Sequence, residues 1–75
     1  MRELVAFIAS GLVDKPEAVA VSVGEEDDTL LLELRVANED LGKVIGRQGR
    51  TVRAMRSLLS AVARDQRKVR LEIVE

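Results

Sequence analysis

The first stretch of the chain carries apolar residues at the spacing of one face of an α-helix. These positions are Leu4, Val5, Ile8 and Leu12. The spacing predicts an amphipathic helix over residues 2–13. Asp14-Lys15-Pro16 follows, and we expect it to end the helix because proline disfavours helical geometry in the residue before it.

Three later stretches alternate between apolar and less apolar positions, as a β-strand with one buried face does. They cover residues 19–23, 30–36 and 68–73. In the first stretch the apolar positions are Val19, Val21 and Val23. The run Gly24–Asp28 between the first two stretches is too acidic to bury, so it predicts a turn that joins an antiparallel pair.

Two helices are predicted between the second and third strands. Asn38 can cap a short helix that runs to about Ile45 and ends at Gly46. A second helix begins near Gly49, and its apolar positions lie within about 80° of arc. They are Val52, Met55, Leu59 and Val62. The resulting order, α-β-β-α-α-β, predicts an α+β fold in which helices cover one face of a three-stranded sheet.

The composition excludes several classes of protein. The 75 residues leave room for one domain, residues 1–75. Cysteine and histidine are absent, which removes disulfides, Cys/His zinc sites, thiol nucleophiles and imidazole bases. No paired carboxylates stand beside a plausible nucleophile, so we do not expect an enzyme. The acidic run Glu25–Asp28 is too short for an EF-hand, so we expect no metal, and we expect no cofactor. Because Phe7 is the one aromatic residue, an aromatic platform for stacking bases is excluded.

The sequence also bears on where the protein works. No apolar run approaches the roughly 20 residues that cross a bilayer. No signal peptide is recognisable at the N-terminus, where Glu3 places an acid before the first apolar stretch. We therefore expect a cytoplasmic protein with no membrane partner.

Charge is segregated along the chain although the net charge is only -1. Ten of the 13 acids but three of the 12 bases lie in residues 1–42. A run of bases without any acid follows: Lys43, Arg47, Arg50, Arg53, Arg56 and Arg64. Such a run indicates either an anion-binding face or a solvated helix surface, and charge alone does not decide between them.

The segment Gly46-Arg47-Gln48-Gly49 stands at the junction of the two predicted helices. Glycines permit a tight turn and the close approach of another backbone, and the following helix directs unpaired N–H groups into the same space. A phosphodiester suits this arrangement. Arg47 and Arg50 would supply charge, and Gln48 would hydrogen-bond to sugar or phosphate.

Three competing motifs fit less well. A P-loop is excluded because Val44 stands where its first glycine is needed and Arg50 replaces its lysine. Gly42, Gly46 and Gly49 lack the spacing of a dinucleotide fingerprint and lie between helices. A helix-turn-helix does not ordinarily sit within a three-stranded sheet.

The segment Val44-Ile45-Gly46-Arg47-Gln48-Gly49-Arg50-Thr51-Val52 resembles the signature of a KH domain, whose GXXG loop clamps about four single-stranded nucleotides. The element order resembles the type II KH arrangement, and its coverage of nearly the whole chain resembles the KhpA family of small bacterial RNA-binding proteins. The resemblance implies a non-enzymatic binder of single-stranded RNA, acting as a post-transcriptional regulator or RNA chaperone. It also implies a homodimer, or a heterodimer with a larger KH-containing RNA-binding protein.

The motif and the charge pattern together define a candidate RNA site. Its members are Lys43, Ile45, Gly46, Arg47, Gln48, Gly49, Arg50, Val52 and Arg53. The loop would hold the sugar-phosphate backbone while bases lie over an apolar floor formed by parts of Val44, Ile45 and Val52. Ile45 and Val52 fit the core as well as a groove, and Arg53 and Arg56 either follow phosphates or are simply solvated.

Two further hypotheses remain open. One is an assembly module that binds RNA only secondarily, because Ala54 and Ala61 give one side of the long helix a small-residue surface. The resemblance also places the acidic turn Glu25–Asp28 beside the nucleic-acid groove, where it would repel phosphate and shorten the accessible site.

Overall fold

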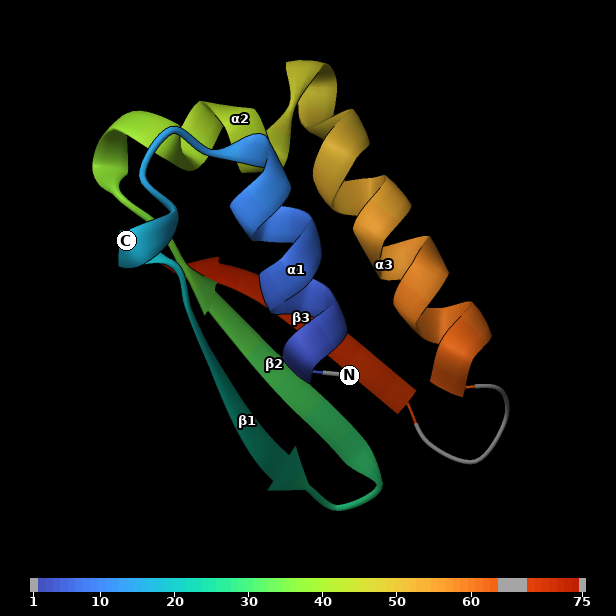
Figure 1. The fold of residues 1–75 in the computed structure, drawn as a ribbon. Coiled ribbons are helices and arrows are strands. Elements are labelled where there is room, and N and C mark those ends of the chain that lie inside the picture. Colours follow the sequence, from blue (N-terminus) through green and yellow to red (C-terminus); the bar gives the residue numbers. More distant parts are fainter. Residues whose placement is uncertain (1, 64–67, 75) are drawn as a thin grey trace.

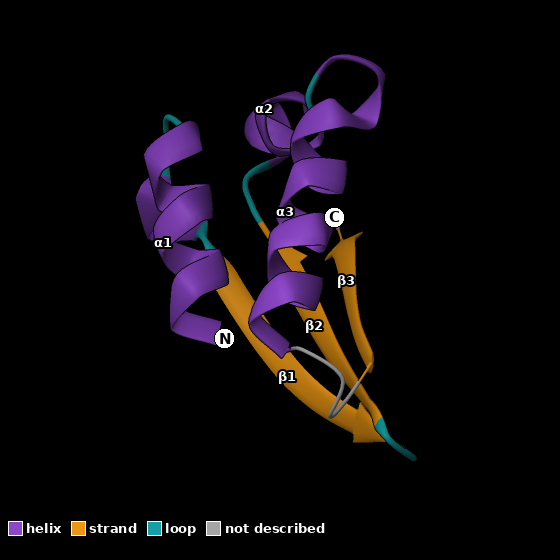
Figure 2. Cartoon of the chain, turned by 90° about the vertical axis from the view of Figure 1, so that its right-hand side faces the viewer, coloured by secondary structure: helices purple, strands orange, loops and turns teal. Residues whose placement is uncertain are grey.

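The computed structural model describes residues 2–63 and 68–74, which form two layers (Figures 1 and 2). One layer holds three helices: α1 (Arg2–Leu12), α2 (Leu41–Ile45) and α3 (Arg50–Ala63). The other holds three strands: β1 (Ala20–Glu26), β2 (Thr29–Arg35) and β3 (Lys68–Val74). Short 3-10 helices join them: η1 (Pro16–Ala18), η2 (Asn38–Asp40) and η3 (Arg47–Gly49). The predicted α+β order and the one-sided helical layer are confirmed.

The sheet is mixed, with β2 in the centre. β1 pairs with β2 in the predicted antiparallel sense, so that Val21 lies opposite Leu34. β3 pairs with β2 in parallel and places Leu71 beside Leu32. A parallel neighbour requires a crossover connection, which α2 and α3 provide. β3 is therefore an edge strand that lies alongside α3 (Figure 2).

The core lies between the two layers. The buried positions of α3 are ones that its apolar periodicity predicts, whereas α1 buries Ala9 beside the predicted Val5 and α2 adds Val44. The strand residues of the core lie at the predicted inward positions. The buried set is Val5, Ala9, Leu32, Leu34, Val36, Val44, Val52, Met55, Leu59 and Leu71. Packing against these residues fixes α3 over β3, and with it the position of the glycine loop that precedes α3.

Three residues expected on buried faces are exposed. Leu12, the last residue of α1, is 38% exposed. Val23 is 46% exposed because it lies toward the β1–β2 turn, where the hairpin extends past the helical layer (Figure 1). Val62 is 49% exposed in the last turn of α3. The helical or strand period around these residues is correct, but period alone does not report whether another layer covers them.

Two local expectations are wrong in detail. β1 continues through Glu26, so the turn predicted over Gly24–Asp28 consists of Asp27 and Asp28 alone. Asp27 has φ 55°, as two-residue hairpin turns require. Asn38 does not cap a helix through its side chain, because it is the first residue of η2, and α2 begins only at Leu41.

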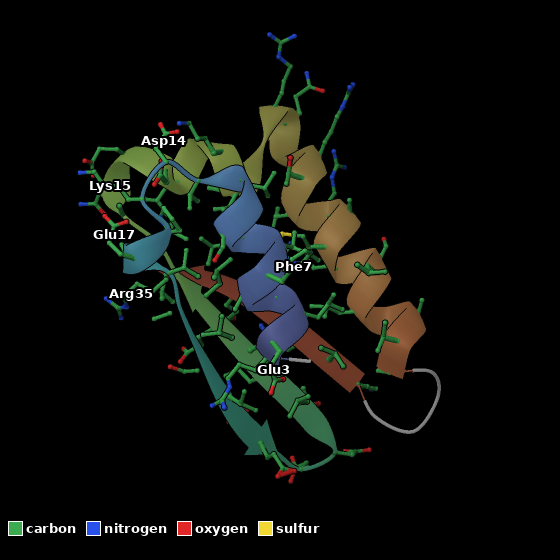
Figure 3. All side chains as sticks on the ribbon, in the orientation of Figure 1. Glu3, Phe7, Asp14, Lys15, Glu17 and Arg35 are labelled. Atoms are coloured by element: carbon green, nitrogen blue, oxygen red, sulfur yellow. The ribbon has the colours of Figure 1, made fainter. Side chains whose placement is uncertain are left out.

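Asp40 joins the start of α2 to the segment that follows α1. Its carboxylate is buried at 1% exposure and accepts hydrogen bonds from the backbone amides of Asp14 (3.2 Å) and Lys15 (3.0 Å). Figure 3 shows Asp14 and Lys15 beside the start of α2. Because a buried carboxylate needs partners, these bonds fix α2 against the N-terminal segment.

Candidate nucleic-acid interface

The segment Gly46–Gly49 forms a sharply bent loop at the junction of α2 and α3. Its backbone leaves ordinary helical geometry at three of four positions: φ is 79° at Gly46, 58° at Gln48 and 74° at Gly49. The loop lies at the end of the molecule opposite the β1–β2 turn (Figure 1). Arg47 and Gln48 are exposed at its tip.

The two glycines are needed for different reasons. A Cβ at Gly46 would collide with the Thr51 side chain and lie 2.8 Å from the Thr51 backbone nitrogen. At Gly49 the nearest atom to such a Cβ is Arg53 Nε at 4.0 Å, so only its positive φ favours glycine there. Glycine at position 46 therefore allows the loop to pack closely against the first turn of α3. Glycine at position 49 is favoured only by its positive φ.

The loop uses some of its amides internally. The amide of Gly46 donates to the Gly42 carbonyl (2.9 Å), and that of Gly49 donates to the Gly46 carbonyl (3.1 Å). The amide of Arg50 donates to the Arg47 carbonyl. Within residues 2–63 and 68–74 the amides of Arg47 and Gln48 have no hydrogen-bond partner. Because Arg47 and Gln48 are exposed, these two N–H groups are available to a ligand.

Arg47 and Arg50 flank this position as unpaired cations. Both side chains are exposed, and neither guanidinium group forms a hydrogen bond or ion pair with the described part of the chain. The first turn of α3 contains no acid, although acids are normally favoured at a helix N-terminus. Figure 3 shows nitrogen-tipped side chains projecting from this end of α3 into solvent. The positive end of α3 and these guanidinium groups together attract an anion.

Lys43 is directed away from the loop toward the N-terminal segment. Its ammonium pairs with the Asp14 carboxylate and lies 3.7 Å from Asp40 Oδ1. The hydrogen bond to Asp14 raises the pKa of Lys43 above its usual value. Nearby, Lys15 Nζ donates to Glu39 Oε2 at 2.5 Å, which raises the pKa of Lys15 and lowers that of Glu39. The structure therefore places Lys43 in a surface ion-pair cluster.

Two arginines of α3 hydrogen-bond to backbone carbonyls. Arg53 Nη2 donates to the Gln48 carbonyl (2.9 Å), and Arg53 Nε donates to the Gly49 carbonyl (3.3 Å). Arg56 Nε donates to the Leu71 carbonyl on β3 (3.2 Å). The run of bases in the sequence is thus divided: Arg47 and Arg50 are unpaired, whereas Arg53 and Arg56 are engaged.

The apolar residues expected to form a groove floor separate in the same way. Val44 is fully buried and Val52 is 7% exposed, so both belong to the core. Ile45, immediately before the loop, is 39% exposed. It is the member of this trio that a base can contact.

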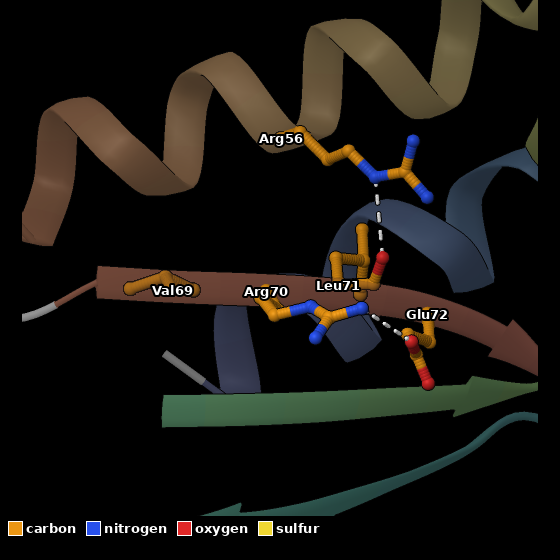
Figure 4. Close-up of a pocket in the computed structure, with 5 residues that line it drawn as sticks. All are labelled: Arg56, Val69, Arg70, Leu71 and Glu72. Atoms are coloured by element: carbon orange, nitrogen blue, oxygen red, sulfur yellow. Dashed lines mark hydrogen bonds and ion pairs between the residues drawn. The ribbon is translucent and has the colours of Figure 1, made fainter. Parts of the chain in front are cut away.

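A cavity of about 380 Å³ lies between α3 and the edge of β3, and the sequence analysis did not identify it. Its lining residues are Arg56, Val69, Arg70, Leu71 and Glu72 (Figure 4). Arg70 Nη2 pairs with Glu72 Oε2 at 3.0 Å at its rim. The β3 residues of this lining come to lie beside α3 because β3 pairs in parallel with β2. No local sequence signal therefore identifies the cavity.

In the part of the chain that the structure describes, no group of three or more acidic side chains is arranged to hold a metal ion. None of the helices in that part is long and apolar enough to cross a membrane.

A mixed three-stranded sheet, helices on one face and a GXXG loop between two of them define a KH domain. The family described as "KhpA/KhpB, KH domain" matches residues 2–73, and the chain belongs to this family. The resemblance inferred from the loop sequence is therefore confirmed.

Relatives match over essentially their full length. The chain is 50% identical to the RNA-binding protein KhpA of Chlamydia trachomatis, covering 100% of this chain and 97% of that protein. It is 48% identical to the RNA-binding protein KhpA of Clostridium perfringens, covering 99% and 100%. A crystal structure of Aquifex aeolicus Era bound to GDP.AlF4- shares the fold over 96% of this chain and 28% of that one, with a TM-score of 0.58 and 24% identity.

Proposed function

We propose that this protein binds single-stranded RNA and holds its sugar-phosphate backbone at the loop Gly46–Gly49. One observation carries the proposal: the unpaired amides of Arg47 and Gln48 and the unpaired side chains of Arg47 and Arg50 belong to the same loop and acid-free helix start. The relatives named RNA-binding protein KhpA support RNA as the ligand.

The mode of binding follows from the chemistry of these groups. Backbone N–H groups and arginine side chains recognise phosphate without reading sequence, so binding is strongly salt-dependent and modestly specific. The bases then lie toward exposed Ile45 and toward the cavity between α3 and β3. Arg56 and the polar side chains of β3 that line the cavity offer donors and acceptors there. Among the described residues, no aromatic side chain lines the cavity.

The experiment measures binding of a fluorescein-labelled single-stranded RNA of mixed sequence. Gly46→Asp/Gly49→Asp places two carboxylates at the phosphate position, and we expect at least tenfold weaker binding, equivalent to about 1.4 kcal/mol. Gly11→Asp is the control for an added acid, because Gly11 lies in α1 and an added Cβ there meets nothing within 4 Å.

A second variant covers the case in which Gly46→Asp disturbs folding. Arg47→Glu/Arg50→Glu changes only exposed side chains, and it is expected to weaken binding at least as much. If both loop variants bind the RNA like the wild type while folded, the proposed site is wrong.

The proposal extends to the cellular role. A phosphate-directed binder with modest specificity suits a post-transcriptional regulator or RNA chaperone that acts on many transcripts in the cytoplasm, by binding and not by catalysis. Crosslinking in cells followed by sequencing of the attached RNA tests this role. A broad set of transcripts supports it, and a single dominant RNA contradicts it.

We also propose that α3 mediates pairing with a second copy of this chain or with a larger KH-containing protein. An exposed stripe supports this: Leu58 is 42% and Val62 49% exposed, and the small residues Ala54 and Ala61 lie on the same side of the helix. The measurement is molar mass by light scattering after gel filtration. Leu58→Asp is expected to reduce a dimer to a monomer, whereas Ser60→Asp, on the other side of α3, leaves it intact.

A further inference from the structure

The two hydrogen bonds from Arg53 join α3 back to the loop that precedes it. The guanidinium uses two of its three nitrogens, at 2.9 Å to the Gln48 carbonyl and 3.3 Å to the Gly49 carbonyl. The fork geometry of arginine suits two adjacent acceptors, and lysine cannot reproduce it with a single ammonium group. The sequence analysis assigned Arg53 to the RNA site; the structure shows it bound to the protein's own backbone.

The two residues whose carbonyls accept these bonds have unusual backbones. Gln48 has φ 58° and ψ 26°, the left-handed region that residues other than glycine rarely adopt. Gly49 follows with φ 74°. Two successive left-handed residues reverse the chain sharply, and both are exposed or half-exposed without core packing to hold them. The Arg53 bonds are the side-chain contacts that hold this pair.

The location of Arg53 supports the same conclusion. A cation in the first turn of a helix is opposed by the helix dipole, so it needs compensating acceptors. Arg53 finds them in the Gln48 and Gly49 carbonyls. Its guanidinium is therefore engaged by the protein's own backbone, whereas the neighbouring amides of Arg47 and Gln48 have no partner among the described residues.

We propose that Arg53 is a positioning residue that holds the GXXG loop in its RNA-binding conformation before RNA arrives, and that Arg47 and Arg50 make the phosphate contacts. This inference rests on the proposed RNA-binding function. Preorganisation lowers the conformational entropy lost on binding. Arg53 therefore contributes to affinity without adding a phosphate contact of its own.

The salt dependence of binding separates the two roles. Each phosphate contact to a single strand contributes about 0.7 to the slope of log K against log salt. Arg53→Gln is expected to weaken RNA binding about tenfold, because RNA binding would then have to order about one loop residue that the wild type already holds in place. The salt slope of this variant is expected to be unchanged. The matched variant Arg50→Gln is expected to lower the slope by about 0.7.

Loop order in the free protein provides a readout that does not depend on RNA. The amide order parameters of Gln48 and Gly49 are expected to fall from about 0.85 to below about 0.6 in Arg53→Gln, and to stay high in Arg50→Gln. Arg53→Lys keeps the charge but loses the fork, so it is expected to resemble Arg53→Gln in both measurements.

Three outcomes would overturn the inference. One is a reduced salt slope with rigid loop amides in Arg53→Gln, which would make Arg53 a phosphate contact. Another is full rescue of affinity by Arg53→Lys, which would show that charge alone matters. The third is unchanged loop order in folded Arg53→Gln. If the wild type fails to bind RNA, the proposed function fails, while loop order in the free protein still decides the role of Arg53.

Discussion

The buried carboxylate of Asp40 accepts a hydrogen bond from the backbone amide of Lys15, which lies 25 residues earlier in the chain, at 3.0 Å. A second bond comes from the neighbouring amide of Asp14 at 3.2 Å. Asp40 is the one buried charged residue in the described structure. This contact ties the segment after α1 to the start of α2, and so to the loop that α2 precedes.

Removing this carboxylate is expected to destabilise the fold. Asp40→Ala leaves two partly buried amides without acceptors, so we expect a loss of about 2–3 kcal/mol in the free energy of unfolding. Urea denaturation followed by circular dichroism measures it. The control is Glu39→Ala, an exposed neighbour whose surface ion pair with Lys15 contributes little, so its loss is expected to cost much less. Equal losses in the two variants would contradict the role assigned to Asp40.

Replacing three glycines separately by alanine is expected to give a rank order in stability. Gly46→Ala is expected to cost more than about 2 kcal/mol, because its Cβ meets the Thr51 backbone in addition to the positive φ. Gly49→Ala is expected to cost about 1–2 kcal/mol from its left-handed conformation alone. Gly42→Ala lies in α2 with open space around it and is expected to stabilise by up to about 1 kcal/mol. Thermal or urea unfolding gives the order, and a cost at Gly42 equal to that at Gly46 would refute the account of the loop.

Stability is expected to decline in strongly alkaline solution. The pKa values of Lys15 and Lys43 are raised above the ordinary 10.5, by hydrogen bonds to Glu39 and Asp14 respectively. A raised pKa in the folded state contributes stability that is complete below the unfolded value and is lost as pH rises through the folded value. The melting temperature is therefore expected to fall above about pH 10.5 and to fall less in Lys15→Gln/Lys43→Gln.

High salt provides the control for this pH effect. Both ion pairs are exposed, so salt is expected to weaken their contribution at neutral pH. An identical alkaline decline in the wild type and the double variant would show that other groups cause it.

The acidic tip of the β1–β2 hairpin is expected to limit how long an RNA can bind favourably. The hairpin tip lies at the other end of the molecule from the glycine loop (Figure 1). The Asp28 carbonyl accepts a hydrogen bond from the Lys68 amide at 3.2 Å, so the tip lies beside the start of β3. Neutralising Glu25–Asp28 to Gln and Asn is expected to strengthen binding of longer RNA a few-fold by removing like-charge repulsion. Binding of an RNA of about four nucleotides, the length that a GXXG loop clamps, is expected to be unchanged. Equal effects on both lengths, or none on either, would contradict this prediction.

Much of this protein could be predicted from local sequence. Apolar spacing predicted α1, the three strands and the buried positions Val52, Met55 and Leu59 of α3, because periodicity reports which side of an element faces the core. Gly46 and Gly49 identified the loop, because few backbones other than a tight turn need two glycines at that spacing. Val23 and Val62 were predicted to be buried but are exposed, because the period of a strand or helix does not report whether another layer covers that residue.

Tertiary structure alone decided which partner each basic side chain binds. Lys43, Arg53 and Arg56 belong to one basic run in the sequence, yet each donates to a different acceptor: Asp14, the loop carbonyls and the Leu71 carbonyl. The parallel alignment of β3 with β2, and the cavity it forms with α3, likewise follow only from packing. The physical reason is range: residue spacing specifies the conformation of a single element, whereas a side chain's hydrogen-bond partner depends on which distant segments the core brings beside it.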